Sequence, residues 1–298
     1  MSSVRLRAWF WATRPFSLQA AVVPVLMGSA LALEVGSLDW LLFALALVGS
    51  VSIQVATNLT DEYSDHRRTR SAAKFLAPHK VIERGLLSEQ AVLVGTLVAF
   101  GAGIGTGLYI VWEVGWPILA VGLASVAVAY LYSGGPYSLG RLGLGEATVF
   151  VFMGPIMVMA AYYVQVQELS WTALGASAPV AFLVTAILHC NNLRDVAEDR
   201  EEGKRTLVSA MGVSAGRWLY VGMLTAAYAS LVALVATGTL HLLALAGLST
   251  LPRALATTAG LWKAKGRPAL NRALISTSQL HGLTGVTMAG GLALSTLV

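Results

Sequence analysis

Charged side chains are scarce in this chain of 298 residues. Asp, Glu, Lys and Arg together make up 12% of the sequence, about half the share that is typical of soluble domains. Hydrophobic residues make up 56%, and they gather in long runs. This composition excludes an ordinary soluble domain and predicts a polytopic membrane protein.

Cysteine is almost absent as well. The single cysteine, Cys190, excludes an internal disulfide framework and a zinc site built from Cys alone. The N-terminal stretch MSSVRLRAWFWATRP also lacks a small-residue cleavage site, so we expect a juxtamembrane segment and not a cleaved signal peptide.

Long apolar segments are what the sequence does contain. A spanning helix needs roughly 20 mainly apolar residues. We predict an all-α fold with nine transmembrane helices in one bundle, forming a single membrane-embedded domain over residues 1–298. The eighth segment is the weakest, because Pro252 and Arg253 interrupt it. The nine segments are 16–35, 39–60, 91–112, 115–133, 145–166, 171–192, 217–237, 239–258 and 277–297.

The charges are distributed unevenly between the two sides. With nine spans, the N-terminus, every second loop and the adjoining helix ends hold all 20 Lys and Arg. The positive-inside rule then places the N-terminus in the cytoplasm and the C-terminus outside the cell membrane. The net charge of +5 follows from this topology and from attraction to anionic lipid, so we expect membrane lipid and no nucleic acid as a partner. The opposite loops contain only the acids Glu34, Asp39, Glu113 and Glu168.

An acidic octapeptide pattern, N-L-x-D-x-x-x-D, occurs twice. NLTDEYSD occupies residues 58–65 and NLRDVAED occupies residues 192–199, with an offset of 134 residues from Asn58 to Asn192. Four predicted crossings separate the two copies, so both lie on the cytoplasmic face. The pattern indicates a direct repeat of two four-helix halves, roughly 1–140 and 141–270, followed by a final helix.

Each octapeptide predicts a stripe of oxygen ligands on one helix face, because residues three and four apart are neighbours there. Two such stripes facing each other across a cavity would repel unless cations neutralise them. Mg²⁺ prefers oxygen ligands and is typically held by one or two carboxylates and substrate phosphate, so the pattern indicates Mg²⁺ and a diphosphate substrate. The stripes are Asn58, Asp61 and Asp65, and Asn192, Asp195 and Asp199.

Basic residues follow each stripe and are candidates for binding phosphate oxygens. A simpler interpretation is that the acids only pair with these basic loops, but the repetition at one offset disfavours it. A transporter is a second alternative, yet it would favour acids near mid-membrane and inverted repeats. The basic residues are His66, Arg67, Arg68, Lys74, Lys80 and Arg84 after the first stripe, and Arg200, Lys204 and Arg205 after the second.

The motifs resemble those of the UbiA superfamily of membrane prenyltransferases. WATRPFSLQAAVVPVLMGSALA (11–32), APHKVIERGLLSEQAV (77–92), YSGGPYSLGRLGLGE (132–146) and NNLRDVAEDREEGKRTL (191–207) are similar to the branch that prenylates 1,4-dihydroxy-2-naphthoate. The resemblance implies Mg²⁺-dependent transfer of an isoprenyl chain from its diphosphate to that aromatic acceptor. The acceptor's carboxylate would be lost and demethylmenaquinone formed. Other acceptors in the superfamily remain alternatives: 4-hydroxybenzoate, haem, chlorophyllide, homogentisate or a glycerol lipid.

The resemblance also implies roles for particular residues. Asp195 and Asp199 would bind one Mg²⁺, while Asn58 and the acids of the first motif would bind a second. Where the branch commonly has an Asn and an Asp in its first motif, this chain has Asp61 and Glu62. The repeat favours Asp61 as the ligand and the family alignment favours Glu62, so both stay candidates. Contacts to diphosphate would come from Arg14, Arg200, Lys204 and Arg205, and the loop after the fourth span would close over the site with Tyr132, Tyr137 and Arg141.

Three neighbouring residues precede the second motif. His189 is a candidate for handling acceptor protons if it faces the cavity, or else a hydrogen-bonded helix residue. We expect Cys190 to be a small core residue. Asn191 and Asn192 are adjacent, so they cannot both face inward, and the repeat favours Asn192.

Overall fold

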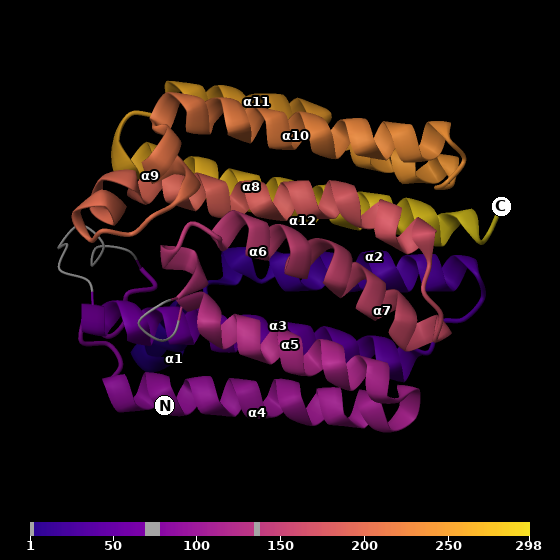
Figure 1. The fold of residues 1–298 in the computed structure, drawn as a ribbon, viewed down its shortest axis with the longest axis horizontal. Helices are drawn as coiled ribbons and strands as arrows, with labels where there is room; N and C mark the ends of the chain where they lie inside the picture. Colours follow the sequence, from indigo (N-terminus) through magenta and orange to yellow (C-terminus); the bar gives the residue numbers. More distant parts are fainter. Residues whose placement is uncertain (1–2, 69–77, 134–137) are drawn as a thin grey trace.

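The computed structural model describes residues 3–68, 78–133 and 138–298. Over these ranges the chain is helical apart from its connections and one isolated backbone bridge between Leu142 and Arg205. The helices lie side by side along the long axis of the molecule (Figure 1). The predicted all-α class is confirmed.

The elements follow the predicted segments closely. The first half contains α1 (Ser3–Ala12), η1 (Pro15–Ser17), α2 (Gln19–Glu34), α3 (Trp40–Arg68), α4 (Glu89–Val114) and α5 (Trp116–Ser133). The second half contains η3 (Leu139–Arg141), α6 (Gly145–Val151), the π-helical turn η4 (Phe152–Ile156), α7 (Met157–Val166), α8 (Trp171–Glu201), α9 (Leu207–Met211), α10 (Val213–Ala236), η5 (Leu242–Thr250), α11 (Leu251–Lys263) and α12 (Gly266–Ser295).

Six helices among the described residues are long and apolar enough to cross a membrane. A seventh arises if α1 and α2, which meet at a bend of 53°, form one span. α5 is a shorter apolar helix, and α12 covers the ninth predicted segment. The chain is therefore a multi-pass membrane protein, while the count of nine spans and the arrangement in two repeated halves stay predictions.

Polar caps and a helix defect set the local geometry. The Ser88 and Ser170 side chains accept hydrogen bonds from the first turns of α4 and α8, as expected for N-caps. Between α6 and α7, η4 contains Pro155, which has no N–H to donate. Next to it, Gly154 allows close approach to α8, because a Cβ there would lie 2.3 Å from the Ala181 Cβ. These features hold the helix containing η4 against the helix that carries the second acidic motif.

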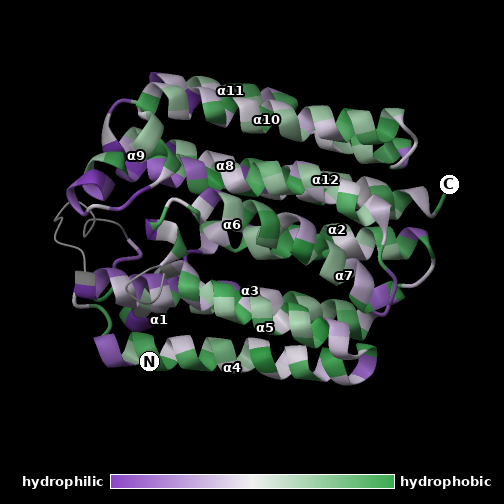
Figure 2. Ribbon diagram, in the orientation of Figure 1, coloured by the Kyte–Doolittle hydropathy of each residue, from purple (hydrophilic) through white to green (hydrophobic). Residues whose placement is uncertain are grey.

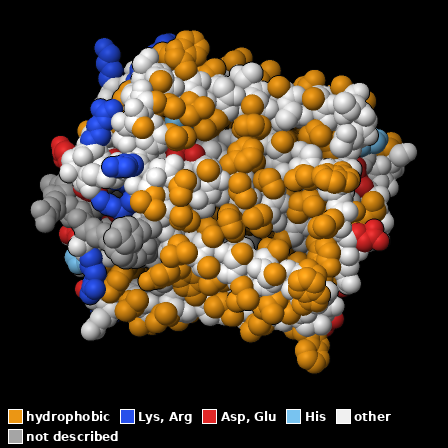
Figure 3. Space-filling view, in the orientation of Figure 1, with side chains coloured by type: hydrophobic (Ala, Val, Ile, Leu, Met, Phe, Trp, Pro, Cys, Tyr) orange, Lys and Arg blue, Asp and Glu red, His pale blue; other side chains and the backbone are white. Residues whose placement is uncertain are grey.

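Polar and apolar residues separate along the helices. Figure 2 shows hydrophobic residues over the middle of the bundle and hydrophilic ones toward its ends. On the face drawn in Figure 3, Lys and Arg gather at one end of the molecule. The motif-bearing ends of α3 and α8 lie at this end (Figure 1), which we call the basic end.

Candidate active site

A cavity of about 540 Å³ runs into the bundle from the basic end. Its polar part is lined by α3, α8 and the loop that precedes α4, and its apolar part continues between α3, α4, α5 and α7. A charged head group and a long apolar tail would therefore find different surroundings within one continuous space.

The first motif presents its predicted stripe to this cavity. Asn58, Asp61 and Asp65 all lie on the cavity wall, one helical turn apart along α3. Asp61 forms an ion pair with Arg14, and Asp65 Oδ2 lies 2.5 Å from Lys80 Nζ. The stripe is therefore neutralised by cations from two other segments of the chain.

Glu62, the alternative to Asp61, is turned away from the cavity. Its side chain is 1% exposed, its Oε1 accepts a hydrogen bond from the Ile82 N–H at 3.1 Å, and its Oε2 lies 3.4 Å from Lys80 Nζ. Asp61 borders the cavity and Glu62 does not. Glu62 is thus placed to fix the loop that carries Lys80.

The second motif brings one of its two aspartates to the cavity wall. Asp195 accepts hydrogen bonds from Arg194 Nε at 2.8 Å and Nη2 at 2.6 Å. Arg267 Nη2, from the start of α12, lies 2.7 Å from the same carboxylate. Asp199 is fully buried, does not border the cavity, and lies 3.4 Å from Lys204 Nζ.

The expected orientation of Asn192 is wrong. Its Nδ2 donates to Glu146 Oε1 at 2.9 Å, and Asn191 lines the cavity in its place. His189 also turns away from the cavity: its Nε2 donates to the Gly216 carbonyl at 2.8 Å, and its Nδ1 lies 3.3 Å from Glu146 Oε1. The face of α8 that borders the cavity passes through Leu188, Asn191 and Asp195, so neighbouring positions point elsewhere.

The predicted basic residues divide into two groups. Arg14, Arg141 and Lys204 line the cavity, as does Tyr132. Three arginines lie away from it: Arg67 pairs with Glu89 at 2.5 Å, Arg200 donates to the Ser209 carbonyl at 3.1 Å, and Arg205 is exposed. Their expected placement at the phosphate site is not met: Arg67 and Arg200 lie in the last turns of α3 and α8 with partners away from the cavity, and Arg205 lies in the loop after α8. Tyr137, Lys74 and the Arg68 side chain lie outside the described residues.

Other residues complete the polar end without being singled out in the sequence. Lys80 is one basic residue among several in the sequence. Arg194 occupies a position at which the two octapeptides differ, and Arg267 lies outside every motif. His79 also lines the cavity. Burial lowers the pKa of its imidazole well below the usual range, and Arg14 and Lys80 lower it further, so His79 is neutral at neutral pH.

The polar end carries more positive than negative charge. Among the described residues on the cavity wall, six are Lys or Arg and four are Asp or Glu, a surplus of two positive charges. This surplus suits an anionic ligand such as a diphosphate. The cations are Arg14, Lys80, Arg141, Arg194, Lys204 and Arg267, and the acids are Asp61, Asp65, Asp195 and Glu202.

The donor set also fits Mg²⁺. No three His, Cys, Asp or Glu side chains of the described segments come together as a closed metal-binding group. Mg²⁺ does not need one, because it is held by one or two carboxylates and completes its shell with water and substrate phosphate. Asp61, Asp65 and Asp195 present carboxylates on the cavity wall. Each lies beside a Lys or Arg side chain that could bind a phosphate group when the carboxylate binds Mg²⁺.

An apolar cavity with a cationic and acidic mouth, enclosed by apolar helices long enough to cross a membrane, fits a membrane protein that binds a lipid with a charged head group. Comparison with known proteins makes this specific. The model of the UbiA prenyltransferase family matches residues 21–295, so the chain belongs to that family and is a prenyltransferase.

Relatives and solved structures agree with this assignment. A 1,4-dihydroxy-2-naphthoate octaprenyltransferase of Bacillus subtilis is 35% identical over 76% of this chain and 73% of its own length. An enzyme of the same name from Escherichia coli is 32% identical over 72% of each chain. The apo structure of a UbiA homolog from Aeropyrum pernix shares the fold, with a TM-score of 0.70 at 14% identity over 94% of this chain and 96% of that one. A homolog from Archaeoglobus fulgidus bound to GPP and Mg²⁺ gives a TM-score of 0.57 at 10% identity over 94% of this chain and 99% of that one.

Proposed function

We propose that this enzyme transfers an isoprenyl chain from its diphosphate to 1,4-dihydroxy-2-naphthoate, with two Mg²⁺ ions and loss of the acceptor's carboxylate. The observation that carries the proposal is the single cavity that joins a cationic and acidic mouth to an apolar interior. The names of the relatives at 31–35% identity support the acceptor, and the homolog bound to GPP and Mg²⁺ supports the donor and the metal.

The charged mouth would hold the diphosphate. Asp61 and Asp65 on one side and Asp195 on the other would hold the metal, which supplies charge neutralisation of the leaving group. Arg14, Lys80 and Lys204 would turn from their carboxylates to the phosphate oxygens. Asp199 stays a proposed ligand that reaches the site through a small movement of its helix end. Arg141 would contact the diphosphate from the loop after α5.

The chemistry is an electrophilic substitution on the aromatic ring. The C–O bond between the prenyl chain and the diphosphate breaks, and the diphosphate keeps the electron pair. The resulting allylic cation forms a C–C bond with the ring carbon that carries the carboxylate. That carboxylate leaves as CO₂, and its bonding electrons restore the aromatic ring. Exclusion of water by the apolar walls protects the cation from hydrolysis.

The apolar part of the cavity would take the prenyl tail. It runs along α3 from the level of Asp61 to that of Leu45, which is about 24 Å at 1.5 Å per residue. Ile104, Leu108, Leu119 and Leu123 line it from α4 and α5 and are also exposed on the outer surface. A tail in this space would therefore reach the lipid between α4 and α5.

The metal site is tested by replacing Asp195 with Ala in the purified enzyme and titrating Mg²⁺. We expect prenyl transfer to fall about a hundredfold or more, the scale seen when one preorganised electrostatic contact to a transition state is removed. Glu201→Ala, at the exposed end of α8 and off the cavity wall, is the matched control. Near-normal Mg²⁺-dependent transfer by the Asp195 variant would contradict the mechanism.

The acceptor is tested with a panel. Purified enzyme, Mg²⁺ and geranylgeranyl diphosphate are offered 1,4-dihydroxy-2-naphthoate, 4-hydroxybenzoate, homogentisate and a glycerol phosphate lipid, and products are weighed by mass spectrometry. We expect the naphthoate product, lighter by one CO₂ than simple addition would give. Preference for another acceptor would keep the prenyltransferase and replace the substrate.

A further inference from the structure

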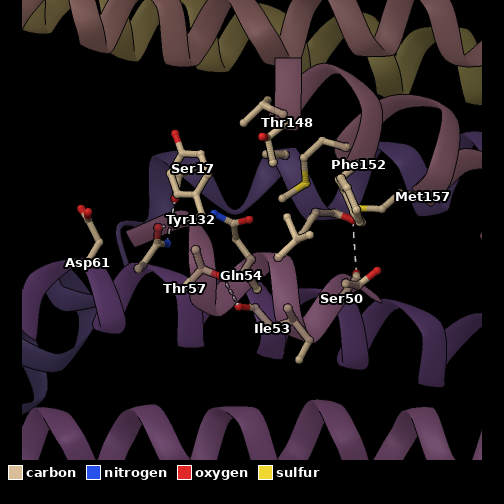
Figure 4. Close-up of a pocket in the computed structure, with 18 of the residues that line it drawn as sticks. Ser17, Ser50, Ile53, Gln54, Thr57, Asp61, Tyr132, Thr148, Phe152 and Met157 are labelled. Atoms are coloured by element: carbon tan, nitrogen blue, oxygen red, sulfur yellow. Dashed lines mark hydrogen bonds between the residues drawn. The ribbon is translucent and has the colours of Figure 1, made fainter. Parts of the chain in front are cut away.

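Gln54 lies on the cavity wall two helical turns along α3 from Asp61, toward the apolar interior. It is 9% exposed, and no diphosphate contact described above uses it; its amide nitrogen lies 3.4 Å from Asn58 Oδ1. Figure 4 shows it beside the same space as Tyr132, Thr57 and Phe152. A buried amide facing a cavity is costly unless both of its ends are hydrogen-bonded.

The orientation of this amide follows from a chain of hydrogen bonds. The Thr13 carbonyl can only accept, so the group facing it at 2.8 Å is Asn58 Nδ2. That nitrogen also donates to Ser17 Oγ at 2.9 Å. Asn58 therefore presents Oδ1 to Gln54, and the Gln54 group 3.4 Å from it is the donor Nε2. The Gln54 oxygen must point the other way.

Among the described residues, that oxygen has no hydrogen-bond partner. Gln54 Oε1 is buried and accepts no bond, whereas nearby hydroxyls on the wall are satisfied: Ser50 Oγ donates to the Ala21 carbonyl at 3.2 Å and Thr57 Oγ1 to the Ile53 carbonyl at 2.8 Å. A buried acceptor left unpaired is energetically costly. A ligand that donates a hydrogen bond here would recover that energy.

The surroundings of the oxygen suit a flat apolar ring. Ile53, Phe152 and Met157 line the same part of the cavity, and the π-helical turn η4 directs Phe152 and Met153 toward it. Gln54 also lies two helical turns farther into the cavity than Asp61. If the diphosphate lies at the mouth, the reacting end of the prenyl chain would meet its acceptor near this depth.

We propose that Gln54 Oε1 accepts a hydrogen bond from a ring hydroxyl of the aromatic acceptor and thereby selects hydroxylated aromatics. This assignment rests on the proposed function. Gln54 would then be a specificity-determining residue: it orients the ring and favours acceptors with an O–H donor over those without one, while the charged mouth recognises the donor.

The experiment measures competitive inhibition of prenyl transfer by naphthoates with and without hydroxyl groups. In the wild-type enzyme we expect 1- or 4-hydroxy-2-naphthoate to bind about five- to tenfold more tightly than 2-naphthoate, the value of one hydrogen bond to a buried group. In Gln54→Met, which keeps the length and removes the acceptor, we expect this preference to vanish while the KM of the prenyl diphosphate changes less, because only the hydrogen bond to Asn58 is shared with the metal site.

Gln19→Met is the matched control. Gln19 Oε1 is also buried without a partner, but it does not border the cavity, so the preference should persist in that variant. Equal binding of the hydroxylated and unsubstituted naphthoates by the wild-type enzyme would overturn the assignment, and this measurement does not depend on folding of a variant. A Gln54 variant that loses donor affinity instead would also overturn it. Absence of transfer with every acceptor would overturn the proposed function itself.

Discussion

At the scale of residues, the carboxylates of the two motifs have different surroundings although their sequences match. Asp61 and Asp65 border the cavity beside Arg14 and Lys80. Asp195 is held by two arginines, and Asp199 is buried behind the wall near Lys204. Each acid lies beside a cation in the absence of metal, so we expect substrate binding to exchange these ion-pair partners and not to bring new charges from solvent.

The contrast between Asp61 and Glu62 gives a prediction. Asp61→Asn should lower prenyl transfer about a hundredfold, because a charge at the cavity wall is lost, and should leave thermal unfolding near the wild-type temperature. Glu62→Gln should lower the free energy of unfolding by about 1 to 3 kcal/mol, since it disturbs a buried ion pair that fixes the loop near Ile82, and should affect turnover of the folded enzyme less. Both are measured by transfer assays and thermal unfolding in detergent. The reverse pattern would identify Glu62 as the metal ligand.

At the scale of elements, the rotation of α8 about its axis decides which residues reach the cavity. The line Leu188, Asn191 and Asp195 faces inward, so Asn192 and His189 turn to Glu146 on α6. The close contact of Gly154 with Ala181 is one constraint on this rotation. On α3, Asn58 does border the cavity, whereas Asn192, which matches it in the second copy of the motif, does not. The two copies of the motif therefore point different side chains toward the cavity.

The α4 helix offers a test of the tail path. Gly107 lines the apolar part of the cavity and Gly105 does not, and a Cβ at either would meet nothing within 4 Å. We expect Gly107→Phe to lower turnover of geranylgeranyl diphosphate about tenfold or more relative to geranyl diphosphate, because the added ring narrows a part of the cavity that the shorter tail does not reach. Gly105→Phe should match the wild type. An equal loss for both donors would place the tail elsewhere.

At the scale of the whole molecule, the Lys and Arg residues gather at one end (Figure 3). The ends of α8 are about 45 Å apart at 1.5 Å per residue, which is long enough to cross a bilayer, so we expect charged groups near them on opposite sides of the membrane. The predicted orientation places the basic end, with the mouth of the cavity, in the cytoplasm.

Two matched cysteine variants test this orientation. Glu168 precedes α8 and Glu201 ends it, and both are exposed, while the native Cys190 is buried and should remain unlabelled. In intact cells, a membrane-impermeant maleimide should label Glu168→Cys and spare Glu201→Cys, and inverted vesicles should show the opposite. Labelling of Glu201→Cys in intact cells would reverse the topology.

Much of the architecture could be predicted from the sequence. The apolar segments coincide with helices to within a few residues over most of their length, because roughly 20 apolar residues have one stable conformation in a bilayer. The acidic motifs were rightly expected near the ends of two of these helices. Less could be predicted of the site. Arg267 comes from α12, far along the chain, and nothing in its local sequence distinguishes it from a topology charge.

The sequence by itself determined the helical membrane fold, the family and the kinds of side chain at the basic end, since these depend on composition, period and motif. Only the tertiary structure decided which face of each helix looks inward: Asp61 and not Glu62, Asn191 and not Asn192. It also left Gln54 Oε1, on a residue of the cavity wall, without a hydrogen-bond partner in the part of the chain that the structure describes. The physical reason is that a helix period fixes which residues share a face, whereas packing against neighbouring helices fixes where that face points.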